Sequence, residues 1–482
     1  MDSVSVNMEE FDFVIVGGGI AGVSCAESLT FLCPDRKIAL VTSSPLIKTV
    51  TNLVSITKML ASFDVEERSV DSLSAANPTL KVIQDSVVGL NSSLHTVLLK
   101  TGNVLKYKKL CICSGAYPKL IPSHNKNIIG IRDTDSVKAF QKRVENSSRI
   151  LVVGNGGIAT EVVHELRGVE LVWVIKDDHI SATFIDPVAA EFFQDKLLKR
   201  DTDYSSPVVK RLKYTVENDS NKPEKSGAAL GPDWHSKYDL SGSLKTDAKV
   251  IVEYKSEVDS ILSPEEVGDC VEKGKNWPVF VKLSNSKVYG CDFVVSATGV
   301  VPCGTFEMED GKAFEMDVDG GIKVDWKMET NLPDVYAAGD VCSAAWERAA
   351  HWFQMRLWTQ ARQMGTYAAK SLAASLQQEM FYQDFCFEMF SHVTKFFGFK
   401  VVLLGLFNGQ TLDNKYELLL RITKGVEYVK LVMKNGRMQG AVLIGETDLE
   451  EMCENLILNQ LDLTEFGEDL LNPDIDIEDY FD

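Results

Sequence analysis

Two glycine-rich turns constrain this chain more than any other feature of its sequence. One lies within FDFVIVGGGIAGVSCAESL and the other within RILVVGNGGIATEVVHEL. Each predicts a strand, a tight turn and a helix, because small residues permit the sharp turn, the close approach of a pyrophosphate and the packing of helix on strand. The small residues of the two turns are, in order, Gly17, Gly19 and Gly22, then Gly154, Gly156 and Ala159.

The two turns together predict two dinucleotide-binding units. The N-terminus of each helix offers free N–H groups and the positive end of its dipole to phosphates. A single copy of this pattern could be a structural glycine turn, whereas two copies in the same context favour two dinucleotides. A chain with two adjoining dinucleotide sites is typical of enzymes that pass a hydride from one to the other.

The length of 482 residues predicts two or three domains. No apolar run reaches the roughly 18 residues that a membrane-spanning helix needs, so we expect no membrane association. The N-terminal segment MDSVSVNMEE lacks the basic and apolar regions of a secretion signal. We therefore expect a cytosolic or nuclear protein whose ten cysteines are mostly reduced thiols.

The net charge of −19 is concentrated near the C-terminus. Fourteen acids lie between Glu446 and Asp482, and no Lys or Arg follows Arg437. The ending NPDIDIEDYFD is either a solvated tail or a docking segment, since it interleaves apolar residues with acids. We expect no direct binding to nucleic acid, because the sequence has no basic stripe.

The order of the patterns predicts an α/β protein with two Rossmann-like dinucleotide-binding domains and a smaller C-terminal α+β domain. Residues 1–122 and 301–375 are expected to form the first, discontinuous nucleotide domain. Residues 123–300 are expected to form the second, with a polar insertion at about 199–276. Within it, GPDWH is interpreted as a surface loop, and the alternative is an anchored island. Residues 376–482 are expected to form the C-terminal domain with its acidic tail.

Three more motifs lie at predicted strand ends. CSGAYP and SATGVVP are matching turns, one after each nucleotide unit, and TNLPDVYAAGD contains a further apolar strand. An acid at the carboxyl end of such a strand faces the ligand of an α/β sheet and can bind the hydroxyls of a sugar-like chain. The binding residues predicted by these motifs are Ser114, Gly115, Thr298, Gly299, Gly339 and Asp340.

These five motifs, in this order, resemble the pyridine nucleotide–disulfide oxidoreductase family over roughly residues 10 to 375. The resemblance implies that the first glycine turn, Gly339 and Asp340 bind FAD. It implies that the second glycine turn binds NAD(P)H. The activity implied is that of a FAD-dependent NAD(P)H oxidoreductase.

Two departures from the family concern the adenosine ends of the cofactors. Family members carry an acid after the second strand, where this chain has Thr42 and Ser43, so hydroxyls or a residue from elsewhere must substitute. The corresponding place in the second unit holds Lys176 and then Asp177. Lysine favours a 2′-phosphate and an acid favours a 2′-hydroxyl, so the choice between NADH and NADPH stays open.

A third departure concerns the disulfide. Family members that reduce disulfides carry a closely spaced cysteine pair soon after the first nucleotide unit, but this chain has no cysteine between Pro34 and Leu110. Cys111 and Cys113 are interpreted as buried structural thiols on an apolar strand. We therefore expect that electrons do not pass through an internal disulfide.

Lys48 and Glu161 are the candidate catalytic residues. By resemblance, Glu161 faces the nicotinamide and Lys48 pairs with it close to the flavin; the alternative is a surface lysine and an ordinary helix residue. A helix is expected from about Arg356 to Ala374, and its N-terminus would stabilise a reduced, anionic flavin. Trp352 and Trp358 are candidates to shield the flavin, or core residues. His351 is a weaker candidate acid, and no metal site is expected.

The leading hypothesis is an enzyme that moves electrons from NAD(P)H through FAD to an acceptor that the sequence does not identify. The alternative is a slow-turnover flavin-containing redox sensor or scaffold, because the chain lacks the disulfide and carries an insertion and an acidic tail. The resemblance implies a role in the oxidative-stress response and association with an oxidation-sensitive RNA ligase complex. Either a monomer or a homodimer is compatible with the sequence.

Overall fold

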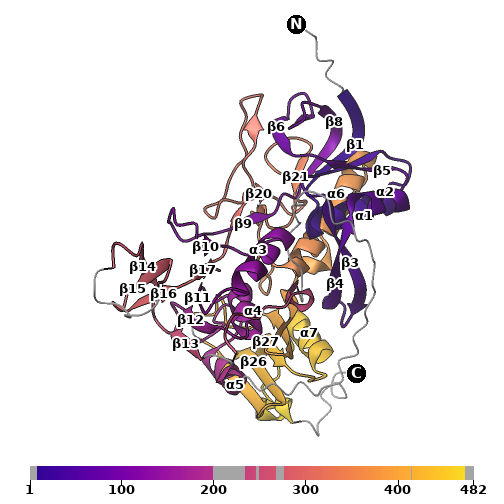
Figure 1. Ribbon diagram of the computed structural model, residues 1–482. Coiled ribbons are helices and arrows are strands. Elements are labelled where there is room, and N and C mark those ends of the chain that lie inside the picture. The colour runs from indigo at the N-terminus through magenta and orange to yellow at the C-terminus, as the bar shows by residue number, and fades with distance from the viewer. Residues whose placement is uncertain (1–7, 199–233, 246–248, 268–275, 414, 473–482) are drawn as a thin grey trace.

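Three β-sheet systems make up the described structure, and the first combines strands that lie before and after the second along the chain (Figure 1). The computed structural model describes residues 8–198, 234–245, 249–267, 276–413 and 415–472. The α/β fold with two Rossmann-like domains and a smaller C-terminal α+β domain is confirmed. The boundaries at residues 122, 300 and 375 stay predictions.

The first system is a sheet in which parallel strands surround β1. Its order is β19-β6-β7-β8-β1-β2-β5, and β21 pairs with the second half of β8. The strands are β1 (Met8–Val16), β2 (Ile38–Thr42), β5 (Leu80–Gln84), β6 (Val87–Asn91), β7 (Thr96–Leu99), β8 (Val104–Ile112), β19 (Glu307–Met308) and β21 (Val335–Ala337). Helices α1 (Ile20–Leu32), α2 (Val70–Ala76) and α6 (Trp358–Gln377) belong to this system, and α1 packs along α6.

The register of this sheet brings the predicted motifs together. Val16 at the end of β1 lies beside Ile112 at the end of β8, and Ile112 lies beside Ala337 at the end of β21. The strand ends β1, β8 and β21 therefore deliver the first glycine turn, CSGAYP and the Gly-Asp pair to one edge. Short pairs complete the system: β3 (Leu46–Ser55) with β4 (Ala61–Ser69), β9 (Ala116–Pro118) with β18 (Val300–Pro302), and β20 (Ile322–Val324) with β22 (Cys342–Ala344).

The second system repeats this plan with a five-stranded parallel sheet of order β10-β17-β11-β12-β13. The strands are β10 (Ile128–Ile129), β11 (Arg149–Val153), β12 (Glu170–Val174), β13 (Val250–Glu253) and β17 (Phe293–Ser296). Its helices are α3 (Thr134–Val144), α4 (Gly157–Glu165) and α5 (Pro187–Leu198). An antiparallel sheet of β14 (Val258–Leu262), β15 (Val279–Leu283) and β16 (Val288–Cys291) packs beside it.

The region predicted as a polar insertion contains regular structure. β13 completes the parallel sheet and β14 opens the antiparallel one, although both fall within residues 199–276. The short apolar runs VIVE and VDSIL pair with β12 and β15, and their polar surroundings hide this in the sequence. The GPDWH segment is not a surface loop at its tryptophan, because Trp234 begins the 3₁₀ turn η1 (Trp234–Lys237) and is only 7% exposed. The rest of the insertion, at 199–233, 246–248 and 268–275, lies outside the described residues.

The third system is the C-terminal antiparallel sheet of order β23-β24-β27-β26-β25. Its elements are η3 (Phe385–Phe387), β23 (Ser391–Phe396), β24 (Phe399–Gly405), β25 (Glu417–Thr423), β26 (Glu427–Lys434), β27 (Arg437–Ile444), α7 (Glu450–Asn459) and η4 (Gly467–Leu471). One face packs on the second system, and the other face packs on α7. The end of the predicted acidic tail, 473–482, lies outside the described residues.

A buried ion pair joins the third system to the second. Lys430 on β26 places its Nζ 2.7 Å from Asp186 Oδ2, just before α5, and Lys430 is 1% exposed. The Tyr428 hydroxyl donates to both oxygens of Asp186 at 3.1 Å. Burial lowers the pKa of Lys430, and the ammonium of Lys430 lowers the pKa of Asp186 against the opposing effect of burial. These contacts fix the C-terminal sheet against α5.

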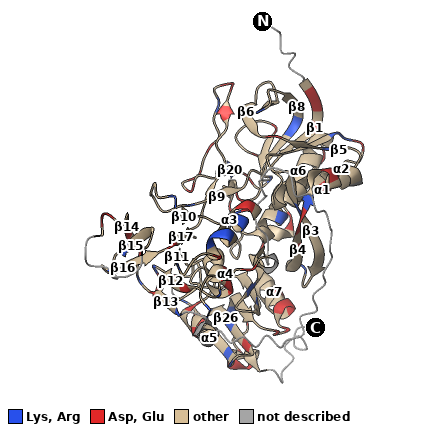
Figure 2. Cartoon of the chain, in the orientation of Figure 1, with Lys and Arg blue, Asp and Glu red and all other residues tan. Residues whose placement is uncertain are grey.

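Charged side chains of both signs are interspersed over the described elements (Figure 2). No helix in the described part of the chain is long and apolar enough to cross a lipid bilayer. The expectation that the protein does not bind nucleic acid directly stays a prediction.

Candidate active site

A cavity of about 990 Å³ lies between the two glycine turns. Both turns, both matching strand-end turns and the start of α6 contribute to its wall. Of the residues predicted from sequence, the cavity is lined by Gly19, Gly115, Gly154, Gly156, Glu161, Lys176, Thr298, Gly299 and Asp340. The fold therefore brings together in one space motifs that are up to about 320 residues apart in the chain.

The first glycine turn is built by close backbone contacts. Gly17 has φ +125°, and a Cβ there would lie 2.1 Å from the carbonyl oxygen of Cys113. A Cβ on Gly22 would lie 1.9 Å from the carbonyl oxygen of Gly17. Gly19 differs, because a Cβ there would meet no heavy atom within 4 Å. Gly17 and Gly22 thus allow the turn to close, and Gly19 leaves open space on the cavity side.

The second glycine turn has the same geometry. Gly154 has φ +130°, and a Cβ there would lie 2.1 Å from the carbonyl oxygen of Ala297. Gly156 faces open space, as Gly19 does, and Ala159 is fully buried where α4 packs on the sheet. The indole N–H of Trp173 on β12 donates to the Gly154 carbonyl at 2.7 Å and fixes the turn from the neighbouring strand.

The helices that follow these turns begin without a side-chain cap. Gly19 is the N-cap of α1 and Gly156 is the N-cap of α4, and neither makes a side-chain capping hydrogen bond. In contrast, α3 has a capping box in which the Asp133 carboxylate accepts from the backbone N–H of Ser136. The first N–H groups of α1 and α4 are therefore available to an anion, which fits the pyrophosphate of a dinucleotide.

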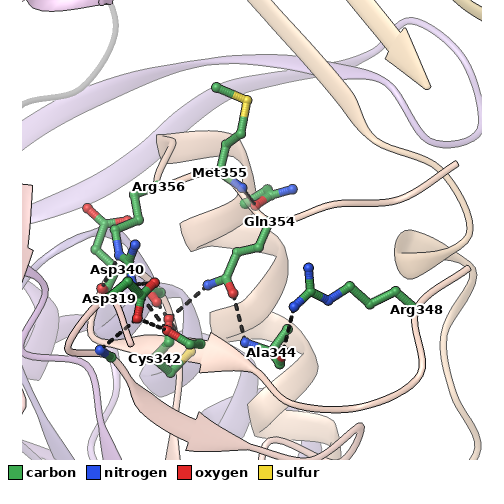
Figure 3. Close-up of polar contacts among 12 residues, drawn as sticks. Asp319, Asp340, Cys342, Ala344, Arg348, Gln354, Met355 and Arg356 are labelled. Atoms are coloured by element: carbon green, nitrogen blue, oxygen red, sulfur yellow. Dashed lines mark hydrogen bonds and ion pairs between the residues drawn. The ribbon is translucent and has the colours of Figure 1, made fainter. Parts of the chain in front are cut away.

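Asp340 presents its carboxylate to the cavity (Figure 3). Within the described part of the chain no group donates a hydrogen bond to this carboxylate, so its oxygens can accept from a ligand's hydroxyls. Burial raises the pKa of Asp340, and the guanidinium groups of Arg356 and Arg132 oppose that shift. Gly339 has no room for a side chain, since its Cβ would lie 2.8 Å from Ala21 Cβ on α1.

The segment before α6 is held against the Asp340 strand end. Arg356 Nε donates to the Asp340 carbonyl at 2.8 Å, and its guanidinium also pairs with Asp319 at 2.8 Å (Figure 3). Gln354 donates to the Cys342 carbonyl and accepts from the Ala344 N–H, both at 2.8 Å. The helix begins at Trp358, two residues later than expected, because Arg356 is used to anchor the segment. The N-terminus of α6 therefore borders the cavity.

The matching strand-end turns are fixed by their own hydroxyls. Ser114 Oγ donates to the Cys303 carbonyl at 2.6 Å, and Thr298 Oγ1 donates to the Lys119 carbonyl at 2.8 Å. Both hydrogen bonds join the CSGAYP region to the SATGVVP region, beside the paired strands β9 and β18. These hydroxyls hold the wall of the cavity, while Gly115 and Gly299 line it.

The two candidate catalytic residues lie in different surroundings. Glu161 on α4 lines the cavity, and its Oε2 accepts from the indole N–H of Trp234 at 2.6 Å. Lys48 on β3 is 5% exposed, and its Nζ lies 2.7 Å from Glu67 on β4. A contact between Lys48 and Glu161 stays a prediction.

The residues expected at the adenosine ends also differ in their placement. Thr42 is buried and accepts from the Ser44 N–H at 3.2 Å, whereas Ser43 is exposed, and neither lines the cavity. Lys176 is exposed at the cavity wall, and the Asp177 carboxylate beside it accepts from Asn155 of the second glycine turn at 2.8 Å. Their roles in binding ribose stay predictions.

Two other candidates, Trp352 and His351, are structural. Trp352 is 3% exposed and stacks on Trp346, and it does not belong to the cavity wall, unlike Trp358. His351 Nε2 lies 3.1 Å from Gln439 Oε1, also away from the cavity wall. The contacts of Trp352 with Trp346 and of His351 with Gln439 are therefore part of the packing of the fold, and the sequence alone does not reveal them.

Cys111 and Cys113 are buried free thiols, with their sulfur atoms 3.6 Å apart. Their mutual hydrogen bonding and burial hold the pKa of Cys113 well above its ordinary value. The pKa of Cys111 is likewise raised, through its hydrogen bond with Cys25 and burial, against the opposing effect of Cys113. The prediction of buried thiols is therefore confirmed.

Among the cavity residues that sequence reasoning missed are Arg132, His392 and Trp234. Arg132 lies over the ring of Tyr117 at 4.4 Å and acts electrostatically on Asp340. His392 on β23 is 1% exposed, and its Nδ1 shares a hydrogen bond of 3.0 Å with the Thr359 hydroxyl. No motif in the sequence marks Arg132, and a single histidine on an apolar strand gave no signal for His392.

His392 makes the stability of the protein depend on pH. Burial lowers the pKa of this histidine to about 3 in the folded state, from the ordinary 6.5. The contribution of neutral His392 to the free energy of unfolding is fully present above about pH 6.5. It is lost progressively as the pH falls toward 3, since in this range only the unfolded chain takes up the proton. We expect wild type to lose roughly 2 kcal/mol more unfolding free energy than His392→Gln between pH 7.5 and 5.0. Urea unfolding at both pH values measures this, and equal losses would contradict it.

The chain belongs to a known family of flavoenzymes. A family model described as pyridine nucleotide-disulphide oxidoreductase matches residues 11–220 and 248–365, which is more than half of the chain. The protein is therefore a member of that family and uses FAD and NAD(P)H as its cofactors. The open space at Gly19 and Gly156, the uncapped helices and the available carboxylate of Asp340 fit these cofactors.

One relative matches almost from end to end. The chain is 51% identical over 490 residues to pyridine nucleotide-disulfide oxidoreductase domain-containing protein 1 of Pongo abelii, covering 98% of each chain. The fold is shared with a covalent putidaredoxin reductase–putidaredoxin complex, with a TM-score of 0.65, 15% identity and coverage of 96% of this chain and 97% of that chain. It is also shared with the water-forming NADH oxidase from Lactobacillus brevis bound to NADH, with a TM-score of 0.64, 15% identity and coverage of 95% and 92%.

Proposed function

We propose that this protein is a FAD-dependent NAD(P)H oxidoreductase that works without an internal redox disulfide. The observation that carries the proposal is the single cavity lined by both glycine turns, with Glu161 in its wall. Two cofactors bound at these turns would share that space, which is the condition for direct transfer between them.

Each group in the cavity has a defined task in this proposal. The start of α1 binds the pyrophosphate of FAD, and Asp340 accepts from its ribityl hydroxyls. The start of α6 directs a positive dipole at negative charge on the ring system. The start of α4 binds the pyrophosphate of NAD(P)H, and Glu161 orients the nicotinamide. Bound FAD supplies the acceptor for a hydride.

The electrons must then leave to an acceptor outside the chain. Both thiols of Cys111 and Cys113 are buried and have raised pKa values, which argues against disulfide chemistry there. Oxygen, a quinone, a carrier protein and a thiol of a partner protein are the candidate acceptors. Of the two structural neighbours, one is bound to the protein putidaredoxin and the other is named as a water-forming oxidase.

The proposed setting is the oxidative-stress response in nucleus and cytoplasm, with an oxidation-sensitive RNA ligase complex as protein partner. Support comes from the family resemblance and from the near full-length similarity to the Pongo abelii relative. The protein would act there as a monomer or a homodimer, by protein contact rather than by binding nucleic acid.

An anaerobic titration of the purified protein tests the activity. We expect a yellow protein that NADH or NADPH bleaches rapidly, and that an added acceptor reoxidises through many cycles. Comparing oxygen, a soluble quinone, ferricyanide and a small disulfide identifies the acceptor class. A single slow reduction with a long-lived charge-transfer band would instead indicate a redox sensor. A colourless protein that cannot be reconstituted with FAD would contradict both functions.

Asp340→Ala is expected to lose flavin while keeping its fold. The substitution removes the acceptor that faces the cavity, and a hydrogen bond to a charged group contributes about 1.5–3 kcal/mol, or a 10- to 150-fold weaker affinity. Flavin content after gel filtration and the apparent Kd for added FAD measure this effect. Asp319→Ala is the matched control on the far side of Arg356 (Figure 3) and is expected to retain more flavin. Full flavin occupancy in Asp340→Ala would remove this residue from the site.

A further inference from the structure

A segment of the predicted insertion runs along α4. This segment, residues 234–244, is here called the α4 strap. Its contacts follow the helix and the loop after it: Trp234 with Glu161, His235 with Glu165 at 3.6 Å, Leu240 with Arg167 at 3.1 Å, Gly242 with Arg167 at 2.8 Å and Leu244 with Gly168 at 2.8 Å. The strap is thus attached by both backbone and side-chain contacts.

Trp234 is the residue of the strap that enters the active-site cavity. It is 7% exposed, packs in the core shared by the second and third sheet systems, and lines the 990 Å³ cavity together with Glu161. Glu161 also lines an adjoining cavity of about 420 Å³, to which His235 and Trp358 contribute. Glu161 therefore stands between two spaces, and Trp234 contacts it from one side.

The hydrogen bond from Trp234 restricts Glu161. The distance between Nε1 and Oε2 is 2.6 Å, which is short for a hydrogen bond from a nitrogen donor. A glutamate side chain has three rotatable bonds, and fixing one of its oxygens removes most of this freedom. The indole N–H can only donate a hydrogen bond, so the Glu161 carboxylate is the acceptor.

We propose that Trp234 is a positioning residue for hydride transfer. Its indole N–H fixes Oε2 of Glu161, and the carboxylate so fixed sets the orientation of the nicotinamide ring over its acceptor. The indole also occupies the space on one side of Glu161. This inference rests on the proposed function, in which Glu161 faces the nicotinamide.

Trp234→Phe separates the hydrogen bond from the packing. Phenylalanine retains an aromatic ring in the buried position but has no N–H to donate. We expect the limiting rate of flavin reduction by NADH to fall about tenfold, because small losses of alignment affect hydride transfer strongly. The Kd for NADH is expected to change less than twofold, since the pyrophosphate contacts are unchanged. Anaerobic stopped-flow measurements on the holoenzyme over a range of NADH concentrations give both numbers.

A double-mutant cycle tests whether Trp234 acts through Glu161. We expect Glu161→Ala to retain flavin and slow reduction, and the double variant Trp234→Phe/Glu161→Ala to be no slower than Glu161→Ala alone. Trp326→Phe is the control, because that indole stacks on Phe381 away from the cavity and its loss should leave the reduction rate unchanged. Flavin content and thermal unfolding of each variant verify that the fold is kept.

The outcomes distinguish the two proposals. A wild-type reduction rate in Glu161→Ala contradicts the role of Glu161 in the proposed function. A slow Glu161→Ala variant beside a wild-type rate in Trp234→Phe contradicts only the inference about Trp234. Rate losses that multiply in the double variant, or a loss that appears in Kd alone, overturn the positioning role and leave Trp234 as a packing residue.

Discussion

Gly22→Ala is expected to abolish flavin binding and to prevent accumulation of the folded protein. A Cβ on Gly22 would lie 1.9 Å from the Gly17 carbonyl oxygen and 3.3 Å from Cys113 Cβ. The nearest atom is backbone, so α1 would have to move away from β1, the central strand of the first sheet. Overpacking of this kind destabilises by about 3 kcal/mol or more, and the displaced helix could no longer bind a pyrophosphate. Soluble yield, thermal unfolding and flavin absorbance measure the result.

Gly19→Ala provides the matched control for this substitution. It lies three residues away in the same turn, but its added methyl group would meet no protein atom within 4 Å. The fold should therefore be kept, while the methyl group occupies space on the side of the pyrophosphate and weakens flavin binding. Gly156→Ala should act likewise on NAD(P)H and leave flavin content unchanged. A Gly22→Ala protein that folds and holds flavin like wild type would refute this account of the turn.

Lys430→Met is expected to lower the unfolding free energy by about 3–5 kcal/mol. Methionine preserves the apolar contacts of the Lys430 side chain on β26 but leaves the half-buried Asp186 without its counter-charge, 2.7 Å from where Nζ was. The hydrogen bond from Nζ to Asn408 at 2.8 Å is lost as well. Since Asp186 lies directly before α5, the destabilisation should appear where the C-terminal sheet meets the second nucleotide domain. Denaturant unfolding followed by fluorescence measures the total loss.

Lys434→Met, four residues further along β26 at its half-exposed end, is the control for this pair and should change stability by no more than about 0.5 kcal/mol. Hydrogen exchange adds a local test, because amides of β26 and α5 should exchange faster in Lys430→Met than amides of β1. Equal unfolding free energies for the two lysine variants would show that the Lys430–Asp186 pair makes no net contribution to stability.

The features predicted from sequence are those whose chemistry is local. Strand, turn and helix follow one another within about 20 residues at Gly17 and again at Gly154, so small residues at fixed spacing suffice to identify them. The Gly-Asp ending of β21 could be placed because parallel strands present their carboxyl ends at the same edge. Because both nucleotide domains use the same strand–turn–helix pattern, their turns also share the same close backbone contact. Gly17 packs on the Cys113 carbonyl, and Gly154 packs on the Ala297 carbonyl.

The features that were missed depend on contacts between distant parts of the chain. Trp234 meets Glu161 across 73 positions, and His392 meets Thr359 across 33, and no periodic pattern marks either contact. The surroundings of Trp234 are polar, which favoured the interpretation of a surface loop. Strands β13 and β14 were hidden in the same way, because four or five apolar residues become a strand only beside a partner.

The state of the thiols bears on how the protein withstands oxidants. Each of the nine cysteines in the described part of the chain is free, and burial or neighbouring groups raise the pKa of every one of them. Peroxides react with the thiolate, and a thiol kept protonated inside a core offers them almost none. We therefore expect the cysteines in the described part of the chain to survive peroxide concentrations that oxidise exposed, acidic thiols.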